Sequence, residues 1–528
     1  MQDYRQRFVL TRRGLIARSA ALGAGLVVAG HSYSALSATA RPRFSHGIQT
    51  GDVVGDRAVL WARADRPARL NIEWSTTSGF ADAHNLAPVD ALPGSDYTAQ
   101  VVAEGLPQGQ QIYWRARWTA LDDVNSVSSP VIGRFRTQPS AGKSVSFTWS
   151  GDTCGQGWGI NPDMGGMTIY KTMNALSPDF FINSGDCIYA DGPIQAEVTL
   201  ADGSIYRNLT LEGKHKVAET LEEYRTAYRY NLMDDNMRLF LARTPMFSQW
   251  DDHETLNNWY PDEILNDARY KEKRVAVLAR RSKQAFLEYN PTLPATEAGQ
   301  RRVNRYIPYG PSLDVFFLDM RSFRGDNTSN LQTEEGPDTT FLGESQILWL
   351  KRALRASKAT WKVIAADMPI GLNIGDGTAG DGKPQWEAIA NGENGSAKGR
   401  ELEIARLLKF IKDEDIKNTV WLTADVHYTA AHYYDPAKAQ FTDFKPFWEF
   451  VSGPLNAGTF GPNTLDATFG PELKFVKAPP AGQANLPPTA GYQFFGHVEI
   501  DGKTKVMTVN LMDAAGAKLW SIDLTPEA

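Results

Sequence analysis

The sequence contains few of the residues on which small cross-linked or metal-knuckle folds depend. Only two cysteines, Cys154 and Cys187, occur in 528 residues. This count excludes a disulfide scaffold and also a zinc module with four cysteines. Histidine is scarce as well, with eight in the whole chain. Any metal site must therefore take most of its ligands from other residue types.

Positive charge and long apolar runs are also in short supply. The 55 Lys and Arg residues are outnumbered by 61 Asp and Glu, which gives a formal net charge of −6 and a pI near 5.9. Because nucleic-acid phosphates need a basic face, we do not expect nucleic acid as a partner. Beyond the N-terminal region no apolar stretch reaches membrane-spanning length, so we expect no permanent membrane anchor.

The remaining composition is that of a globular protein. Hydrophobic residues make up 42% of the chain and charged residues 22%. This share is enough to build a large core, and it excludes disorder for most of the sequence. A chain of 528 residues is too long for one ordinary compact domain, so we expect two domains.

Residues 1–40 contain the three parts of an export signal in the right order. The twin-arginine pair Arg12-Arg13 comes first, an apolar run over residues 20–30 follows, and Ala38–Ala40 offers a small-residue cleavage site. The alternative, an ordinary basic amphipathic helix, accounts less well for this order. We therefore expect export through the twin-arginine machinery to the periplasm or the medium. That pathway carries folded proteins, often with a metal already installed.

Residues 41–138 predict an all-β domain. Short runs at 58–63, 68–74 and 111–117 are apolar or alternate between apolar and polar residues, with turn residues between them. Their spacing suits a β-sandwich of the immunoglobulin or fibronectin type. No cluster of titratable residues stands out here, so we interpret the domain as a packing or recognition module. A linker over 138–142 follows it.

Residues 145–528 alternate between apolar strands and helical stretches, which is typical of an α/β domain. A helix is expected over 399–412, and antiparallel strands at 494–500, 505–511 and 519–524 close the chain. Six strands end on an acidic residue or run into one: Asp152, Asp186, Asp251, Asp319, Asp367 and Asp425. A single such Asp is usually a cap. Six of them at strand carboxyl ends, where α/β sheets bind ligands, favour a shared cation site.

Four short segments hold the candidate chemistry. In the first, residues 150–157, glycines let the backbone pass close to a ligand. Asp152 could coordinate a hard cation there, and Cys154 is a competing ligand. A Gly-rich turn with an Asp cap explains this segment equally well.

The second segment, residues 184–191, has the sequence S-G-D-C-I-Y-A-D. Asp186 can bridge two cations through its two oxygens, and Tyr189 could bind as a phenolate beside a highly charged metal. Cys187 points away from Asp186 if the segment is extended. We therefore interpret Cys187 as a small buried hydrophobic residue.

The third segment, residues 250–258, places four successive titratable groups after an apolar strand. Such groups are costly to bury unless cations or solvent satisfy them. His253 is suited to proton transfer to a leaving oxygen, and Glu254 could hold its ring. The alternative is an exposed, solvated loop. Trp250 and Trp259 flank the segment and favour burial.

The fourth segment, residues 423–432, contains Asp425 and His427 two positions apart. In an extended segment both side chains face the same side and can reach one metal centre. His432 could join them, but a core position is the favoured interpretation.

These segments together carry a family resemblance. The motifs G-D-x-x-Y at 185–189, D-H-E at 252–254 and D-V-H at 425–427, in this order, resemble the calcineurin-like metallophosphoesterases. More narrowly, they resemble the alkaline phosphatase D (PhoD) family, which the segment 318–324 and the N-terminal signal also fit. The resemblance implies an α/β fold. Its four-layer α/β/β/α sandwich would occupy residues 145–528, behind the all-β domain.

The resemblance also implies a multinuclear centre with Fe³⁺, bound by a tyrosinate, and Ca²⁺. Asp186 would bridge the metals, and Tyr189 would bind the iron. Asp252 stands where the wider superfamily has Asn, and Asp425 where it has the first His of its last motif. The expected metal ligands are Asp152, Cys154, Asp186, Tyr189, Asp252, Asn258, Asp425 and His427. Asp152 is favoured over Cys154 because the wider superfamily opens with Asp.

His253 matches the catalytic histidine of the superfamily. Arg321 or Arg324, just past a strand end, could add a phosphate contact, with a surface ion pair as the alternative. The implied reaction is hydrolysis of small phosphomonoesters by in-line attack of a metal-bound hydroxide. Two other functions remain open: a phosphodiesterase or phospholipase D-like enzyme, and a metal-stabilised binding protein without catalysis. The stretch 371–398 is long enough to cover the site.

Overall fold

The computed structural model describes residues 41–294 and 301–527. The predicted twin-arginine signal, residues 1–40, lies outside the described residues. Within the described ranges, none of the helices combines the length and the hydropathy that a crossing of the bilayer requires.

The N-terminal domain is built from strands. They are β1 (Phe44–Val54), β2 (Arg57–Ala64), β3 (Ala68–Ser75), β4 (His84–Asn85), β5 (Val89–Ala91), β6 (Thr98–Ala103), β7 (Gln111–Ala120) and β8 (Val131–Arg136). One sheet has the order β1-β2-β6 and the other the order β4-β3-β7-β8, with β5 paired to β3. Every second residue of β7 is buried, including Trp114 and Trp118, because successive side chains of a strand point to opposite faces. The three predicted strand runs fall within β2, β3 and β7.

The rest of the described chain contains two larger sheets. The six-stranded sheet has the order β13-β10-β9-β23-β24-β25. Its strands are β9 (Val145–Ser150), β10 (Phe180–Ser184), β13 (Met246–Gln249), β23 (Phe494–Ile500), β24 (Met507–Asp513) and β25 (Lys518–Leu524). Strands β9, β10 and β13 run parallel, whereas β23, β24 and β25 pair antiparallel. The predicted closing meander is therefore confirmed.

The seven-stranded sheet has the order β14-β15-β16-β19-β21-β20-β22. Its strands are β14 (Arg305–Pro308), β15 (Leu313–Phe317), β16 (Trp361–Ala365), β19 (Thr419–Thr423), β20 (Thr429–Tyr434), β21 (Phe447–Val451) and β22 (Pro471–Lys477). The central strands β15, β16, β19 and β21 are parallel. Two small hairpins lie outside the sheets: β11 (Glu197–Thr199) with β12 (Ile205–Arg207), and β17 (Gly375–Thr378) with β18 (Pro384–Trp386).

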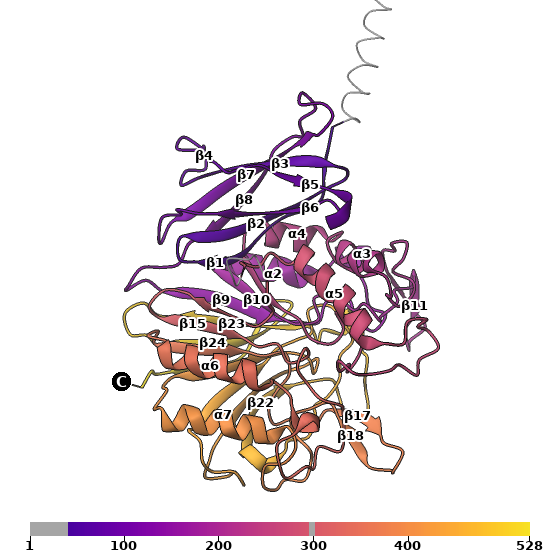
Figure 1. The fold of residues 1–528 in the computed structure, drawn as a ribbon, viewed down its shortest axis with the longest axis vertical. Coiled ribbons are helices and arrows are strands. Elements are labelled where there is room, and N and C mark those ends of the chain that lie inside the picture. Colours follow the sequence, from indigo (N-terminus) through magenta and orange to yellow (C-terminus); the bar gives the residue numbers. More distant parts are fainter. Residues whose placement is uncertain (1–40, 295–300, 528) are drawn as a thin grey trace, which may run out of the picture.

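Six helices complete the described part of the chain. They are α2 (Thr168–Leu176), α3 (Leu221–Asn231), α4 (Asp235–Leu241), α5 (Val275–Tyr289), α6 (Glu344–Ala356) and α7 (Glu401–Asp413). Phe181 of β10 packs against Phe240 of α4, so α4 lies on one face of the six-stranded sheet. Ile347 of α6 and Ile404 of α7 share a core with Phe316 of β15. In Figure 1 the N-terminal strands lie at the top, and α6 and α7 lie at the lower end.

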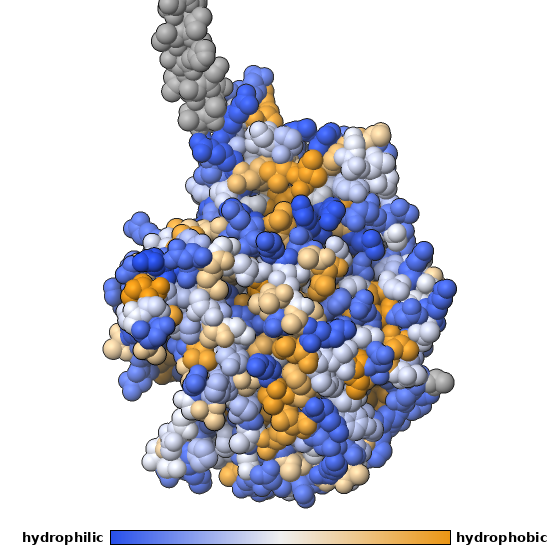
Figure 2. Space-filling model, turned by 180° about the vertical axis from the view of Figure 1, so that it is seen from behind, coloured by the Kyte–Doolittle hydropathy of each residue, from blue (hydrophilic) through white to orange (hydrophobic). Residues whose placement is uncertain are grey.

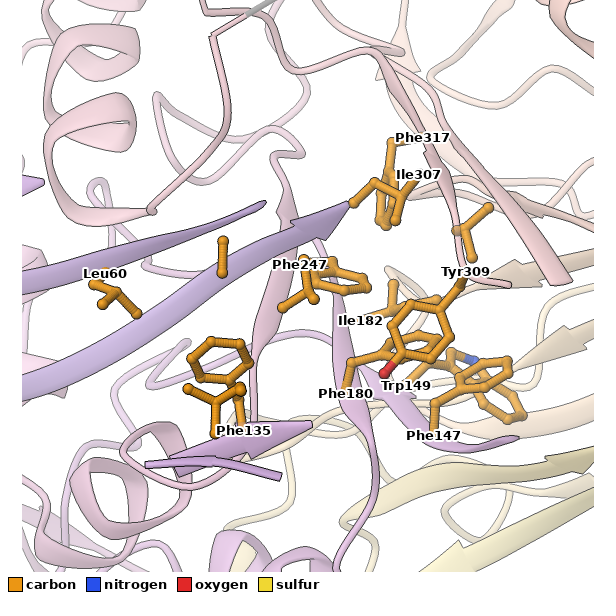
Figure 3. Close-up of a cluster of buried hydrophobic side chains, with 14 of the residues drawn as sticks. Leu60, Phe135, Phe147, Trp149, Phe180, Ile182, Phe247, Ile307, Tyr309 and Phe317 are labelled. Atoms are coloured by element: carbon orange, nitrogen blue, oxygen red, sulfur yellow. The ribbon is translucent and has the colours of Figure 1, made fainter. Parts of the chain in front are cut away.

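The two large sheets face each other across a shared aromatic core, drawn in Figure 3. Phe180 of β10 stacks on Phe147 of β9 with ring centroids 4.7 Å apart. Phe247 of β13 meets Phe317 of β15 edge to face, at 6.4 Å between centroids. The two mixed sheets and the helices that pack on them agree with the α/β class that the sequence predicts.

The surface is mixed in character. On the face shown in Figure 2, hydrophobic residues form separate patches among hydrophilic ones. Exposed large hydrophobic side chains such as Val124 and Ile264 come from different parts of the chain. Scattered exposure of this kind is normal for a folded protein.

Candidate metal centre

Three of the six predicted acidic strand ends meet at one pocket. Strands from both large sheets contribute to it: Asp186 follows β10, Asp252 follows β13, and Asp425 follows β19. The pocket has a volume of about 410 Å³. Its lining includes Asp186, Asp252, His253, Asn258, Asp425 and His427. The prediction of one shared crevice at the strand carboxyl ends is therefore confirmed for these three strands.

Potential ligand atoms gather in three overlapping groups here, each with its atoms within 4.8 Å of one another. The groups are Asp152 with Asp186 and His427, Asp186 with Asp252 and His253, and Asp251 with Asp252 and Asp425. Because Asp186 and Asp252 each belong to two groups, the arrangement suits neighbouring cations that share carboxylates.

The backbone of the site is unusual. Six candidate residues have a positive φ: Asp152 (67°), Cys154 (64°), Asp186 (48°), Asn258 (56°), Asp425 (65°) and His427 (61°). Such φ values are uncommon outside glycine and cluster at functional sites. The prediction that residues 425–427 are extended is wrong, because both Asp425 and His427 adopt the left-handed conformation. As a result the two side chains enter different groups.

Gly185 shows how tightly the loops are packed. Its φ is 101°, and an added Cβ would lie 2.5 Å from the Cβ of Asp251. A larger residue would separate the loop after β10 from the loop after β13. The glycine of the second segment therefore allows Asp186 and Asp252 to share a group.

His427 and Tyr189 face each other across the first group. The Tyr189 hydroxyl lies 2.8 Å from Nε2 of His427, and Nε2 lies 3.6 Å from Oδ1 of Asp152. Nδ1 of His427 bonds to the carbonyl oxygen of Gly458. This contact places the proton on Nδ1 and leaves the Nε2 lone pair directed at the group, as metal-binding histidines require. Burial lowers the pKa of His427 to about 4, which keeps the ring neutral.

His253 is held by Asp191, not by Glu254 as predicted. Nδ1 of His253 lies 2.7 Å from Oδ1 of Asp191. Glu254 instead accepts hydrogen bonds from the backbone amides of Cys187 (2.6 Å) and Asp251 (2.8 Å), and so ties two site loops together. The prediction failed because residue spacing does not show which neighbouring carboxylate a ring will face. Asp191 was visible in the second segment, but nothing local linked it to His253.

Charge at the site is strongly perturbed. Burial first, and then nearby carboxylates such as Asp252, raise the pKa of Asp152, Asp186 and Asp425 well above the ordinary value. Burial alone would lower the pKa of His253, but the charges of Asp191 and other carboxylates raise it well above its ordinary value. The protein thus holds more negative charge here than its own cationic groups balance.

Arg321 does not take the role that the sequence predicted. Its side chain is fully buried and does not line the pocket. Its guanidinium lies 2.5 Å from carboxylate oxygens of both Asp251 and Glu387. It is therefore neither a substrate contact nor a surface ion pair, but a buried counterion behind the centre. Glu387 lines the pocket and was missed, because no local pattern marks it.

Arg324, the other predicted phosphate contact, is also buried. Its guanidinium donates to the side chain of Asn327 at 3.0 Å and to the carbonyl oxygen of Glu387. Both arginines therefore organise the loops behind the pocket. Their place after β15 was read correctly, but their direction was not.

The two cysteines lie in apolar surroundings. Cys154 is fully buried with its Sγ 3.6 Å from the sulfur of Met167, outside the three ligand groups. Asp152 belongs to a ligand group, which agrees with the preference for Asp152 over Cys154. Cys187 is buried in the same core cluster, as predicted. His432 is also a core residue, and its Nδ1 lies 3.1 Å from Glu449.

Not every acidic strand end reaches the pocket. Asp319 accepts hydrogen bonds from the indole of Trp250 (2.9 Å) and from the backbone amide of Ser322 (2.9 Å). Asp367 accepts one from the amide of Met368 and lies 3.8 Å from Arg321. These two carboxylates have the capping and charge-balancing roles that an isolated Asp usually has.

The stretch 371–398 forms part of the pocket wall. Ile374, Gly375 and Glu387 line the pocket, and the β17–β18 hairpin extends from it. Asp376 accepts a hydrogen bond of 2.8 Å from the side-chain amide of Asn258. The backbone amide of Asn258 in turn donates to Asp252 at 2.6 Å. The stretch is therefore bonded to the centre through Asn258.

The residues present fit bound cations. In the described part of the chain, one oxygen each of Asp152 and Asp425 is buried without a hydrogen-bond partner. A buried carboxylate oxygen without a hydrogen-bond partner destabilises the folded state, and a bound cation compensates for this. The donor set of carboxylates, a phenol and an imidazole is hard, which suits Ca²⁺ and Fe³⁺ better than a thiolate-seeking metal.

Comparisons with known proteins identify the family of the chain. Residues 147–511 match the family model of the PhoD-like phosphatases, and residues 31–139 match that of their N-terminal domain. Alkaline phosphatase D of Bacillus subtilis (strain 168) is 28% identical over 441 residues, covering 77% of this chain and 69% of the relative.

Two solved structures show the same fold. A structure of PhoD matches with a TM-score of 0.66 at 20% identity, covering 93% of both chains. A purple acid phosphatase from yellow lupin (Lupinus luteus) seeds matches with a TM-score of 0.53 at 10% identity, covering 92% of this chain and 74% of the other. Because the PhoD-like model spans more than half of the sequence, the chain belongs to the PhoD-like phosphatase family and is a phosphatase.

Proposed function

We propose that the protein is an exported, metal-dependent phosphatase that hydrolyses phosphomonoesters, with phosphodiesters as a second substrate class. One observation carries the proposal: a carboxylate oxygen of Asp425 that is buried without a partner lies in the same pocket as a histidine whose ring is held by Asp191. Membership of a phosphatase family removes the alternative of a metal-stabilised binding protein without catalysis.

The proposed cations are Fe³⁺ and Ca²⁺. Their proposed ligands are Asp152, Asp186, Tyr189, Asp252, Asn258, Asp425 and His427. Bound there, the cations would neutralise phosphoryl oxygens and lower the pKa of a coordinated water. Tyr189 supports iron in particular. Burial, and then Asp186 and Asp152, raise the pKa of the phenol well above its ordinary value, so that a phenolate needs a strongly charged metal.

The residues of the chain would supply the acid–base part of the reaction. His253 lies in the pocket, and Asp191 fixes the proton on its Nδ1. The opposite nitrogen, Nε2, can then donate a proton to the leaving oxygen of the ester. Asn257 lines the same pocket, and its side-chain amide can orient a phosphoryl or ester oxygen.

Substrate and metal can be tested together. Purified protein would be assayed with p-nitrophenyl phosphate and bis-p-nitrophenyl phosphate, each with and without added calcium. Faster hydrolysis of the monoester, stimulated by calcium, is expected. A clear preference for the diester would reverse the order of the two substrate classes, and no hydrolysis of either would refute the proposal. A protein that contains only zinc and lacks a tyrosinate–iron absorption band would refute the iron assignment.

Export rests on residues 1–40, whose twin-arginine pair Arg12-Arg13 precedes the apolar run. We expect the full chain to reach the periplasm or the medium, and the variant with both arginines replaced by lysine to stay inside the cell. Cell fractionation followed by the phosphatase assay measures this. Equal export of both chains would contradict a twin-arginine route.

A further inference from the structure

We propose that Phe460, with Ile374 and Val426, forms a specificity wall that selects esters with an uncharged leaving group bearing a flat apolar face. The proposal rests on the phosphatase function above and adds the chemistry of the group that leaves. Aryl phosphates are the simplest members of this substrate class.

The wall belongs to the same pocket as the metal centre. Phe460, Ile374 and Val426 line that pocket together with Asp186 and His253. The ring of Phe460 lies 5.4 Å from the ring of His427, centroid to centroid. A phosphoryl group at the carboxylates would therefore place the rest of its ester within reach of this apolar surface.

Two segments of the chain are bonded together to build the wall. The amide of Asn373 donates to the carbonyl oxygen of Thr464 at 3.0 Å, and the side chain of Asn463 donates to the carbonyl oxygen of Asn373 at 3.0 Å. Leu372 and Leu465 form a further β-bridge. Ile374 follows Asn373 directly and Phe460 precedes Asn463 by three residues, so these bonds hold the two segments that line the pocket together.

The wall also rests on a buried core. Val426 belongs to an apolar cluster with Leu372 and Tyr428, and Ile374 packs against that cluster. Gly461 has a φ of 79°, and a Cβ there would lie 2.5 Å from the ring of Tyr428. The turn that presents Phe460 is thus seated directly on Tyr428. A surface fixed in this way binds a flat group without first having to be ordered.

The charges around the pocket determine which leaving groups fit. Within the described residues, neither Lys nor Arg lines it, whereas Asp186, Asp252, Glu387 and Asp425 do. Cations at the carboxylates would be occupied by the phosphoryl group. A second negative charge on the leaving group would find no Lys or Arg side chain there, and His253 already faces the carboxylate of Asp191. An uncharged group can instead use the Phe460 face and the amides of Asn257 and Asn463.

The test compares substrates on matched variants. Phenyl phosphate, glycerol 2-phosphate and 4-carboxyphenyl phosphate would be assayed with the wild-type protein and with Phe460→Ala, Phe460→Leu and Phe323→Ala. Phe323 is 37% exposed and does not line the pocket, so it controls for the loss of a ring as such. Each variant is compared with the wild type on the same substrate, which cancels differences in intrinsic reactivity.

We expect Phe460→Ala to lower kcat/KM for phenyl phosphate by about fivefold, chiefly through KM, because an aromatic contact is lost. Glycerol 2-phosphate should change less than about twofold, since it offers no flat face to Phe460. Phe460→Leu should fall between, and Phe323→Ala should match the wild type. The wild type should use phenyl phosphate better than its carboxylated analogue. Metal content and Tm, measured on every variant, should stay at wild-type values.

Two results would overturn the proposal. Equal losses on phenyl phosphate and glycerol 2-phosphate would show that Phe460 only packs, and a preference for the carboxylated substrate would contradict the charge argument. Both leave the phosphatase function intact. Failure of the wild type to hydrolyse any ester would instead refute that function and this inference with it. If Phe460→Ala does not fold, the Phe460→Leu variant carries the same comparison.

Discussion

The molecule buries charge in two places and treats it differently. Where the N-terminal domain packs on the larger one, Asp52 pairs with Arg305 at 2.9 Å, with both side chains almost fully buried. Nearby, Asp96 contacts Arg63 at 2.7 Å and Arg229 at 2.6 Å. Each buried carboxylate of this contact meets a guanidinium. The chain itself therefore supplies the compensating charge.

At the metal centre the chain supplies much less of it. Asp152 and Asp425 keep a buried oxygen without a hydrogen-bond partner, and Arg321 is directed mainly at Asp251 and Glu387. Unpaired buried charge destabilises a fold unless a bound ion from outside the chain balances it. The difference indicates that the domain contact is complete as folded, whereas the centre is completed by cations.

The sharpest way to break this comparison is to remove a shared carboxylate. Asp186→Asn should lower kcat by about a thousandfold, because two ligand groups lose a member. The metal-free variant should be at least as stable as the metal-free wild type, since a poorly compensated charge is gone. Initial rates, elemental analysis and urea unfolding measure this. A marked loss of stability without metal would show that Asp186 is paired after all.

Removing the proton donor should separate catalysis from metal binding. His253→Ala should lower kcat by about a hundredfold while the bound metal stays unchanged. Asp191→Asn should give a smaller loss, since it only releases the ring that Asp191 holds. Rates and metal content are measured on the same preparations. If His253→Ala loses its metal, the histidine is a ligand and the acid–base assignment is wrong.

At the domain contact the opposite pattern is expected. Asp52→Asn leaves Arg305 buried without its partner and should lower the free energy of unfolding by about 3 kcal/mol. The kcat of the folded, metal-loaded protein should remain at the wild-type value, since Asp52 does not line the pocket. Urea unfolding and steady-state rates test both parts. Loss of kcat without loss of stability would contradict the proposed division of roles.

The smallest expected effect is a pH dependence. Burial would raise the pKa of Asp96, but hydrogen bonds from Arg63 and Tyr289 and the charges of Arg63 and Arg229 hold it below its ordinary value of 3.8. Its stabilising contribution is therefore complete above that value and is lost as the pH falls below it. Urea unfolding between about pH 5 and pH 3 should show a shallower acid dependence for Asp96→Asn than for the wild type.

At the metal centre the stability should depend on pH in the opposite direction. Without metal, the raised pKa values of Asp152 and Asp425 mean that the folded state binds protons more tightly than the unfolded state. Their contribution to stability is therefore lost as the pH rises. If acidification lowered the free energy of unfolding through both regions of the metal-free protein, the domain contact and the metal centre would not differ in this respect.

Much of the fold was predictable, because it depends on local patterns. Three strands of the N-terminal domain, the helix near 399–412 and the three closing strands were predicted within a few residues. So was the convergence of acidic strand ends on one pocket, since parallel strands carry their carboxyl ends to the same edge.

The details of the site were less predictable. No role was predicted for Asp191, Glu254 was expected to hold His253, and Arg321 was expected to face a phosphate. Each depends on a contact between loops that lie far apart in the sequence, which residue spacing does not encode. Phe460 was missed for a related reason, because it reaches the pocket through a turn that is seated on Tyr428, far away in the chain.

The sequence by itself determined the family, the order of strands and helices, and the acidic residues available to the metal centre. It could do so because apolar periodicity and short motifs are local properties. Only the tertiary structure decided which carboxylates share a cation group, which one holds His253, and which arginines are buried behind the centre. Those choices depend on two packed sheets and on loops in left-handed conformations, where contacts between distant segments set the direction of every side chain.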